Sequence, residues 1–443
     1  MTTTRKISLH DLSKLDAAAR SQLLSRSEAD IAPFLDKVRP IIEAVKTEGD
    51  VALARFAREF DKSPVNPDAI AATPKDFDDA LVKLDQEVLK ALEFAVESIR
   101  KFHQDQKPEE MWLHEIRPGA FAGDRFTPIP SVACYVPRGK GAFPSVVMMT
   151  TIPAVVAGVK DVCIVTPPGP DGKIDDATLV AARLIGVDRV YKCGGAQAVA
   201  AVAYGTQTVQ KCTKIVGPGS PWVVAAKQLL ADIIDPGVPA GPSEAIILAD
   251  ETADGRLAAL DLLIESEHGP DSSAFIVTNS PKVAQDAIAA IPTFWNNMGA
   301  QRVDFSSTVL GGTNGGVVLA PSWDEALAFV NDFAPEHLEI LSSAPFEHLG
   351  KIVNAGEILL GNHTPCTLGN FVLGPNAVLP TNGQAKTASP LSVFDFMKRS
   401  SVGYVTAAGY APLAQKARIL ATYEGFEGHA NAVSEIRDGL LGK

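Results

Sequence analysis

The spacing of hydrophobic positions changes along the chain. Over about the first 110 residues, apolar positions recur every three or four residues among dense charges, and the stretch from Leu81 to Phe102 predicts one long amphipathic helix. From about residue 130, short β-branched runs alternate with Ala-rich helical stretches, and the runs are VACYVP, DVCIVTPP, RVYKC and KIVGPG. This alternation predicts βαβ units on a mostly parallel sheet.

A second alternating series begins near residue 244. Its predicted strands are AIILAD, AFIVTNS, GGVVLAP and EILLG, with helices predicted at 254–266, 281–290 and 322–332. The segment PAGPSEA (239–245) is expected to join the two sheets, because its two prolines and its glycine end one element before the next strand. After about residue 385 the pattern becomes helical again. We therefore expect an α/β fold with two Rossmann-like parallel-sheet domains, a helical N-terminal segment and a small C-terminal helical tail.

Composition and charge exclude several classes of protein. The 443 residues are 46% apolar and 21% charged, which is typical of soluble globular proteins. A formal net charge of −12 and the lack of any long basic run argue against nucleic-acid and anionic-membrane partners. The longest nearly apolar stretch, Phe143 to Val159, contains two prolines and is shorter than the roughly 20 residues that span a bilayer. The polar start MTTTRKISLHDLSKLD and five scattered cysteines, which we expect to be buried structural thiols, suggest a cytoplasmic protein.

Three short motifs carry candidate chemistry. The GPGS loop at 217–220 follows a predicted strand and opens a helix, an arrangement that often binds phosphate, although a simple Gly-Pro turn explains it equally well. Glu265 and His268 share one helix face and are suited to hold one metal ion, unless that face is solvated. Glu336 and His337 follow a proline at a strand or helix start and form a candidate acid–base pair; the alternative is a surface dipeptide.

Taken together, the motifs resemble the histidinol dehydrogenase family from about residue 30 onward. The segments that carry the resemblance are YVPRGKGAFPSVVMMTTIPAVVAGV, GGAQAVAA, KIVGPG, AGPSEAIILAD, ESEHGPDS, FAPEHLE, GEILLGN, GNFVLGPNAVLPT and EGFEGHANAV. The resemblance implies a zinc- and NAD-dependent dehydrogenase that oxidises a primary alcohol to the aldehyde and then to the carboxylate. It also implies a homodimer in which the C-terminal segment of one subunit reaches into the active site of the other.

The resemblance assigns roles to individual residues. Glu336 matches the base that activates water in the second oxidation, and His337 matches the base that takes the alcohol proton in the first. Tyr135, Gln197 and Ser220 stand at positions near NAD. The implied zinc (Zn2+) ligands are Glu265, His268, Asn370 and His429. Substrate contacts are implied for Ser243, Glu265, His268, His337, Asn370, Glu424 and His429.

The chain departs from the family pattern at several of these positions. Glu265 stands where the family has a glutamine ligand and Asn370 where it has an aspartate, so acid and amide have exchanged places and the formal charge is kept. We expect the metal to be retained, since zinc accepts such a ligand set; the alternative is a metal-free paralogue. Ala377 replaces a substrate-contacting histidine, which predicts a substrate other than histidinol. His363 and Cys366 are candidates to line the altered pocket, although surface or core positions are equally consistent with the sequence.

The expected domain division follows the same pattern. Residues 1–25 form an N-terminal segment, 26–130 together with 244–390 a first α/β domain, 131–243 a second, NAD-binding α/β domain, and 391–443 a dimerisation tail.

Three alternative functions are L-histidinol dehydrogenase itself, a catalytically silent binding protein and a metal-dependent hydrolase. The presence of His268, Glu336, His337 and His429 together argues against a silent protein. Tyr135 and Gln197 argue against a hydrolase, which would have no use for them.

Overall fold

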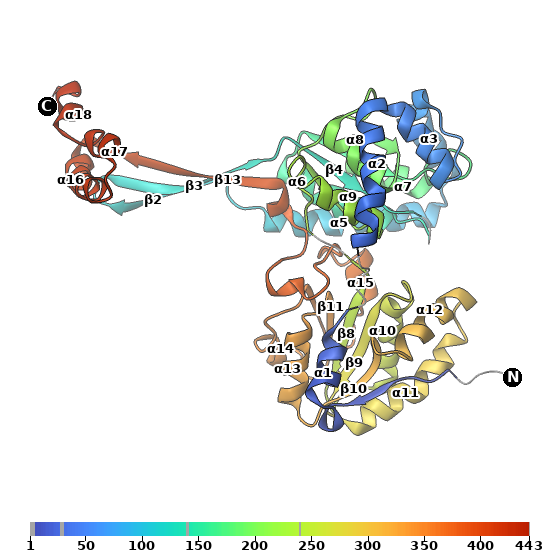
Figure 1. Ribbon diagram of the computed structural model, residues 1–443. Coiled ribbons are helices and arrows are strands. Elements are labelled where there is room, and N and C mark those ends of the chain that lie inside the picture. Colours follow the sequence, from blue (N-terminus) through green and yellow to red (C-terminus); the bar gives the residue numbers. More distant parts are fainter. Residues whose placement is uncertain (1–4, 27–30, 139–140, 239–240, 443) are drawn as a thin grey trace. The chain divides into compact units, whose positions relative to one another are not determined.

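The computed structural model describes residues 5–26, 31–138, 141–238 and 241–442 (Figure 1). It confirms the predicted α/β class with parallel sheets. The chain forms two compact units: Met1–Gln106 with Pro130–Phe396, and Lys107–Ile129 with Met397–Lys443. All five cysteines are buried and none forms a disulfide, as expected. Across the described ranges, no helix has the length and apolar character needed to cross a bilayer.

The first unit contains a four-stranded parallel sheet with the order β6-β5-β4-β7. Its strands are β4 (Ser131–Tyr135), β5 (Asp161–Thr166), β6 (Val190–Lys192) and β7 (Lys214–Val216). The helices of this part of the chain are α6 (Pro144–Ala157), α7 (Asp176–Ile185), α8 (Gly195–Tyr204) and α9 (Pro221–Leu229). The chain moves outward from β4 to β5 and β6 and then returns to place β7 on the other side of β4. The carboxyl ends of β4 and β7 therefore form a topological switch point, where ligands commonly bind in such sheets.

The N-terminal helices pack against this four-stranded sheet. Val38 and Leu53, from α2 (Ala32–Glu48) and α3 (Asp50–Phe60), belong to one hydrophobic core with Ala133 of β4 and Ile215 of β7. Much of the 26–130 segment thus packs with residues 131–243, whereas the sequence had suggested a domain with 244–390. Two sheet domains are present, but their boundaries differ because long-range packing is not visible in local periodicity.

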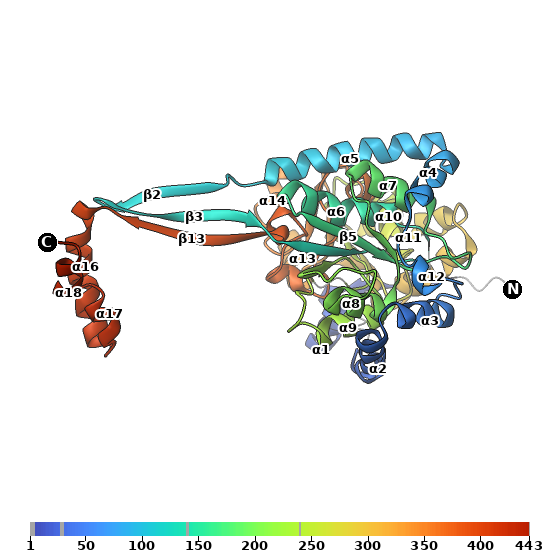
Figure 2. The same cartoon turned by 90° about the horizontal axis from the view of Figure 1, so that it is seen from above.

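The predicted helix from Leu81 to Phe102 is two helices. They are α4 (Pro74–Lys83) and α5 (Gln86–Gln106), and α5 lies alongside α6 and α7 (Figure 2). Leu84 is extended, with φ −64° and ψ 135°. The carboxylate of Asp85 accepts hydrogen bonds from the backbone N–H groups of Glu87 and Val88 at 2.8 and 3.2 Å. Asp85 therefore starts a new helix inside a continuous apolar pattern.

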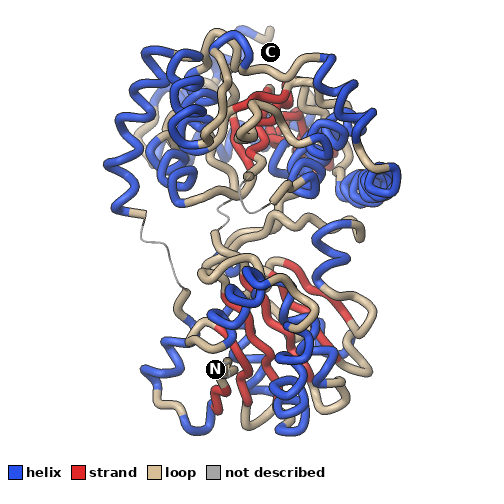
Figure 3. The backbone as a smooth tube through the Cα atoms, turned by 90° about the vertical axis from the view of Figure 1, so that its right-hand side faces the viewer, coloured by secondary structure: helices blue, strands red, loops and turns tan. Residues whose placement is uncertain are grey.

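The second sheet of this unit has six parallel strands in the order β1-β10-β9-β8-β11-β12, with helices on both faces (Figure 3). The strands are β1 (Leu9–Asp11), β8 (Glu244–Ala249), β9 (Ser273–Thr278), β10 (Gly315–Leu319), β11 (His337–Leu341) and β12 (Glu357–Leu360). The helices are α1 (Ala17–Leu24), α10 (Gly255–Ser266), α11 (Pro281–Trp295), α12 (Ala300–Leu310), α13 (Trp323–Phe333), α14 (Phe346–Leu349) and α15 (Cys366–Phe371). Short 3₁₀ helices occupy Leu12–Lys14, Pro67–Ala69, Gln384–Lys386 and Val393–Phe396.

Burial on both faces explains the continuous apolar runs of this sheet. Along β8, Ile246 packs into the core on one face with Phe329 of α13, and Ile247 packs into the core on the other face with Leu262 of α10. Residues 1–25 are part of this sheet domain, since they supply the edge strand β1 and the helix α1.

The second unit is built on a three-stranded antiparallel sheet with the order β13-β3-β2. Its elements are β2 (Met111–Arg117), β3 (Ala120–Pro128), β13 (Met397–Val405), α16 (Ala407–Tyr423), α17 (Glu427–Asn431) and α18 (Glu435–Leu440). The C-terminal segment was expected to be helical, but it contains a nine-residue strand that pairs with β3. Every residue of β2 is exposed, so neither face of this strand has to be apolar. Its sequence therefore lacks the alternation of apolar and polar residues that predicts a strand.

Candidate active site

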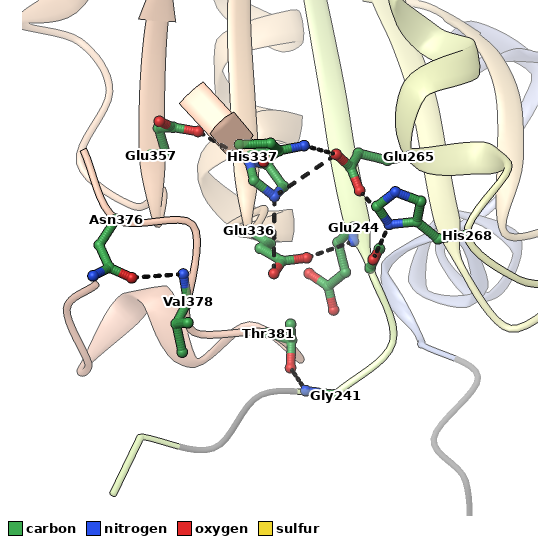
Figure 4. A network of polar contacts seen from close by, with 12 residues as sticks. Gly241, Glu244, Glu265, His268, Glu336, His337, Glu357, Asn376, Val378 and Thr381 are labelled. Atoms are coloured by element: carbon green, nitrogen blue, oxygen red, sulfur yellow. Dashed lines mark hydrogen bonds and ion pairs between the residues drawn. The ribbon is translucent and has the colours of Figure 1, made fainter. Parts of the chain in front are cut away.

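Polar side chains gather at the amino-terminal ends of three adjacent strands (Figure 4). Glu244, His337 and Glu357 are the first residues of β8, β11 and β12, and Glu336 directly precedes β11. The strands are parallel, and His337 pairs in register with Ala245 on one side and with Glu357 on the other. The register therefore brings these side chains to one sheet edge, and Glu336–His337 lies at a strand start and is buried.

The end of α10 brings a second group of side chains to the same place. Glu265 lies in the last turn of α10, whereas His268 follows the helix rather than lying on it as predicted. The two side chains still meet, because Nδ1 of His268 lies 3.0 Å from Oε2 of Glu265. The side-chain amide of Asn370 in α15 donates to Oε1 of Glu265 at 2.8 Å. The hydroxyl of Ser243 lies 2.8 Å from Nδ1 of His268.

His337 joins the two groups. Its Nδ1 lies 3.0 Å from Oε2 of Glu357. Its Nε2 faces Oε1 of Glu265 at 4.0 Å and Oε1 of Glu336 at 3.9 Å. The other oxygen of Glu336 accepts a hydrogen bond from the backbone N–H of Glu244 at 2.9 Å. One imidazole thus lies among three buried carboxyl groups.

These contacts shift the pKa values of the buried groups in opposite directions. Burial would raise the pKa of Glu265, but the imidazoles of His268 and His337 lower it to about 2. Burial raises the pKa of Glu336 to about 8, with His337 opposing that rise. Burial would lower the pKa of His337, but Glu265, Glu336 and Glu357 raise it to about 10. Near neutral pH the carboxyl group of Glu265 is therefore ionised, whereas that of Glu336 is mostly protonated. Such a difference between neighbouring carboxyl groups is typical of acid–base sites.

The candidate NAD residues lie at the carboxyl edge of the four-stranded sheet. Tyr135 ends β4, and its hydroxyl accepts a hydrogen bond from the backbone N–H of Gly195 at 3.0 Å. Gln197 is buried in α8, and Ser220 is the exposed N-cap of α9. These positions follow β4, β6 and β7, so they surround the switch point of this sheet.

The GPGS loop runs against the end of β4. Gly217 has a φ of +109°, and a Cβ atom there would lie 2.2 Å from the carbonyl oxygen of Tyr135. The buried ammonium group of Lys227 donates to the carbonyl oxygen of Gly217 at 2.9 Å, and burial lowers the pKa of Lys227 to about 8. The loop is therefore held in a conformation that requires glycine.

Some predicted site residues lie elsewhere. Glu424 is the C-cap of α16 and His429 belongs to α17, so both are in the second unit, and both are exposed. His363 is exposed and Cys366 is buried. Of the junction at 239–245, Pro239 and Ala240 lie outside the described residues. In the part of the chain that the structure describes, no three His, Cys, Asp or Glu side chains are arranged to hold a metal ion.

Three residues of this region, Arg26, Glu244 and Glu357, were not predicted from the sequence. Glu357 opens the predicted strand EILLG with a carboxylate, an unusual start for a buried strand, and this was the available signal. Arg26 forms an ion pair with Glu244 at 3.1 Å, and its guanidinium lies 3.4 Å from the ring centroid of Phe333. Glu244 also accepts a hydrogen bond from the backbone N–H of Asn382 at 2.6 Å, so its side chain connects the segments of Arg26 and Asn382 to β8, whose first N–H binds Glu336.

The fold and the site define an α/β protein with Rossmann-like parallel sheets, in which buried carboxyl and imidazole groups lie close together at one sheet edge. Residues 24–437 match the family model described as histidinol dehydrogenase. The protein named histidinol dehydrogenase homolog 2 from Mesorhizobium japonicum is 65% identical over 435 residues, 98% of this chain and 99% of that protein. The chain therefore belongs to the histidinol dehydrogenase family, a family of NAD-dependent dehydrogenases, as its sequence motifs indicate.

Two further comparisons agree. A protein from Synechocystis sp. named histidinol dehydrogenase is 47% identical over 430 residues, 97% of this chain and 99% of that protein. The crystal structure of histidinol dehydrogenase from Elizabethkingia anophelis matches with a TM-score of 0.93 and 30% identity, and the match covers 99% of both chains. The likeness therefore extends over the whole fold.

Proposed function

We propose that this protein oxidises a small polar primary alcohol other than histidinol, by way of the aldehyde, to the carboxylate with two molecules of NAD. The observation that carries the proposal is the buried pair Glu336–His337. A carboxyl oxygen of Glu336 lies 3.9 Å from Nε2 of His337, so two proton-transfer groups face one another. An alcohol loses hydride readily only when its hydroxyl proton is withdrawn, and the aldehyde must add water before a second hydride leaves. The two steps need two bases.

In this proposal, Nε2 of His337 takes the hydroxyl proton in the first oxidation. Glu336 then takes a proton from the water that adds to the aldehyde. The pKa of about 8 for Glu336 suits a group that gains and loses a proton near neutral pH. Glu265, Glu336 and Glu357 together raise the pKa of His337 to about 10, and a cation held by Glu265 would lower this pKa and favour Nε2 as a proton acceptor.

Glu265, His268 and Asn370 fit a zinc ion. They supply a carboxylate, an imidazole and a carboxamide, and both the imidazole of His268 and the amide of Asn370 lie within 3.0 Å of the Glu265 carboxylate. Oε2 of Glu265 is buried and faces Nδ1 of His268 at 3.0 Å, so a carboxylate oxygen and an imidazole nitrogen lie together as donors for a cation. A bound zinc ion would supply Lewis acidity that lowers the pKa of the substrate hydroxyl. We propose His429 from a second copy of the chain as the fourth ligand.

A homodimer with a shared site is the second part of the proposal. The second unit exposes many large apolar side chains, and surfaces of this kind mark association sites. Among them are Trp112 (41% exposed), Tyr423 (90%) and Leu440 (84%). The same unit carries Glu424 and His429, so association of two copies offers a route by which these residues complete the site.

The choice of substrate is tested by assay. Purified zinc-loaded protein with NAD is supplied with a panel of primary alcohols and amino alcohols that includes L-histidinol, and NADH is followed. We expect turnover with another polar alcohol and poor turnover with L-histidinol, because Ala377 cannot supply the imidazole contact; such a loss is worth about 1–3 kcal/mol. Preferred oxidation of L-histidinol would support the second candidate, L-histidinol dehydrogenase; the 47% identical relative is named histidinol dehydrogenase.

A further inference from the structure

Glu357 is the side chain that holds the ring of His337. Oε2 of Glu357 lies 3.0 Å from Nδ1 of His337, which is hydrogen-bond distance. Both side chains are almost fully buried, with 5% and 4% of their surfaces exposed. The two residues are register partners on the adjacent parallel strands β11 and β12, so backbone pairing fixes the distance between them.

The other carboxyl groups around His337 hold it less directly. Glu265 and Glu336 both face Nε2, at 4.0 and 3.9 Å, which are distances of charge attraction rather than of a hydrogen bond. An imidazole has two nitrogen atoms, and a neutral ring carries a proton on only one of them. A carboxylate at Nδ1 therefore favours the proton at Nδ1 and leaves Nε2 as the acceptor.

The surroundings of Glu357 limit its movement. Gly369 of α15 packs against its carboxylate so closely that a Cβ atom on Gly369 would lie 2.6 Å from Oε1 of Glu357. In the described part of the chain, Oε1 is buried and accepts no hydrogen bond, so Nδ1 of His337 is the hydrogen-bonding partner of this carboxylate. The cost of burying Glu357 is thus offset mainly through its contact with His337.

We propose that Glu357 is a positioning residue for His337: it accepts the Nδ1 proton, fixes the ring plane and directs Nε2 toward the side occupied by Glu265 and Glu336. The substrate hydroxyl must approach from that side if His337 is the base of the first oxidation, so this inference rests on the proposed function. Removing the orienting carboxylate of such a pair leaves the site intact but allows the unproductive tautomer, which costs up to roughly 10,000-fold in rate.

The test combines a spectroscopic and a kinetic readout on the full-length, zinc-loaded protein. An Nδ1 proton bonded to a carboxylate gives a downfield proton NMR signal, and we assign it by its loss in His337→Gln. Glu357→Gln and the shorter, still charged Glu357→Asp should both lose the signal. With the alcohol found by the panel assay, single-turnover formation of the first NADH should fall at least about 100-fold, while KM for the alcohol and for NAD changes less than about threefold. Exposed Glu347→Gln is the matched control and should keep both.

The results separate the two proposals. A signal that is absent from the parent protein, or that persists in both Glu357 variants, overturns the positioning role. Loss of the signal with an unchanged first turnover overturns it as well. If no alcohol in the panel is oxidised, the proposed function fails, whereas the NMR comparison still decides whether Glu357 holds His337. Thermal unfolding of each variant shows that it is folded, and Glu357→Asp keeps the test open if Glu357→Gln does not fold.

Discussion

The side-chain amide of Asn370 donates a hydrogen bond to the buried carboxylate of Glu265 at 2.8 Å. The resemblance to the family implies an amide at position 265 and an acid at position 370, where this chain carries Glu265 and Asn370. Because the two side chains touch, exchanging them reverses donor and acceptor but keeps the hydrogen bond and the single negative charge. The hydrogen bond thus links the two departures that the resemblance implies, and we interpret them as one compensated change.

This pairing predicts how zinc binding responds to substitution. Glu265→Gln should leave the site without a carboxylate and should lose most of its zinc on dialysis. The fall in zinc affinity should exceed the roughly 10- to 100-fold that results from loss of an outer-shell partner. Asn370→Asp should bind zinc at least as tightly as the parent, and the double variant should recover what Glu265→Gln loses. The measurement is the zinc content per subunit of the parent protein, the two single variants and the double variant. Full zinc retention in Glu265→Gln would show that this ligand set is wrong.

The proposed site shared between two subunits predicts complementation between inactive variants. A His268→Ala chain and a His429→Ala chain should each be inactive as homodimers. Mixed dimers contain one site with both histidines intact, so the mixture should regain up to about a quarter of the parent activity if exchange is random. Light scattering and mass-tagged subunits verify dimer formation and exchange. Complete exchange without any recovered activity would argue that each chain builds its site alone.

The GPGS loop predicts a selective defect in cofactor binding. Alanine at position 217 would clash with the carbonyl oxygen of Tyr135 and would have to adopt a φ of +109°, a strain of about 1–3 kcal/mol that moves the loop. Gly217→Ala should raise KM for NAD roughly tenfold or more and leave KM for the alcohol nearly unchanged. Gly350→Ala, at an open position without positive φ, is the control. An unchanged KM for NAD in folded Gly217→Ala would place the cofactor elsewhere.

A buried carboxyl beneath the site predicts a pH-dependent stability. Burial and the neighbouring Asp261 raise the pKa of Glu339 to about 10, from 4.5 in the unfolded chain. Above pH 4.5 the unfolded state ionises while the folded state keeps its proton, so this group's contribution to stability is lost progressively as pH rises toward 10.

Glu339→Gln removes that loss. The Tm of Glu339→Gln minus that of the parent protein should increase between pH 5 and pH 8 by the equivalent of at least about 1 kcal/mol, roughly 1 °C for a chain of this length. Exposed Glu347→Gln should show no such trend. Calorimetric scans at several pH values provide the comparison, and a difference that is constant or that falls with pH would contradict the assignment.

The sequence predicted those features of the fold and the site that depend on residues close together in the chain. The strand runs, the Glu336–His337 pair and the Glu265–His268 pair each lie within a few residues, so periodicity and short spacing were enough to find them. Glu357 was not found because its contact with His337 exists only once β12 is placed beside β11. The strands β2 and β13 were missed for a related reason: their residues are mostly exposed, and no core imposes an alternating pattern on them.

Domain boundaries were the least predictable feature. Val38 and Leu53 have the same amphipathic spacing whichever sheet they cover, and only the folded core shows that they pack with Ala133 and Ile215. Residues 1–25 read as a separate segment because a three-residue strand such as β1 carries too little pattern to be recognised. The local sequence predicted most helices, most strands and the short polar motifs. Which elements pack or pair with one another could be seen only in the folded structure.

The number of NADH molecules formed per alcohol consumed tests the central claim most directly. With the alcohol selected by the panel assay, the parent protein should form two NADH and release the carboxylate. Glu336→Gln should form one NADH and release the aldehyde, because it keeps the first base and loses the second, and His337→Ala should form none. Two NADH and full conversion to the acid by Glu336→Gln, or a single NADH from the parent protein, would contradict the assignment of two oxidations to this pair of residues.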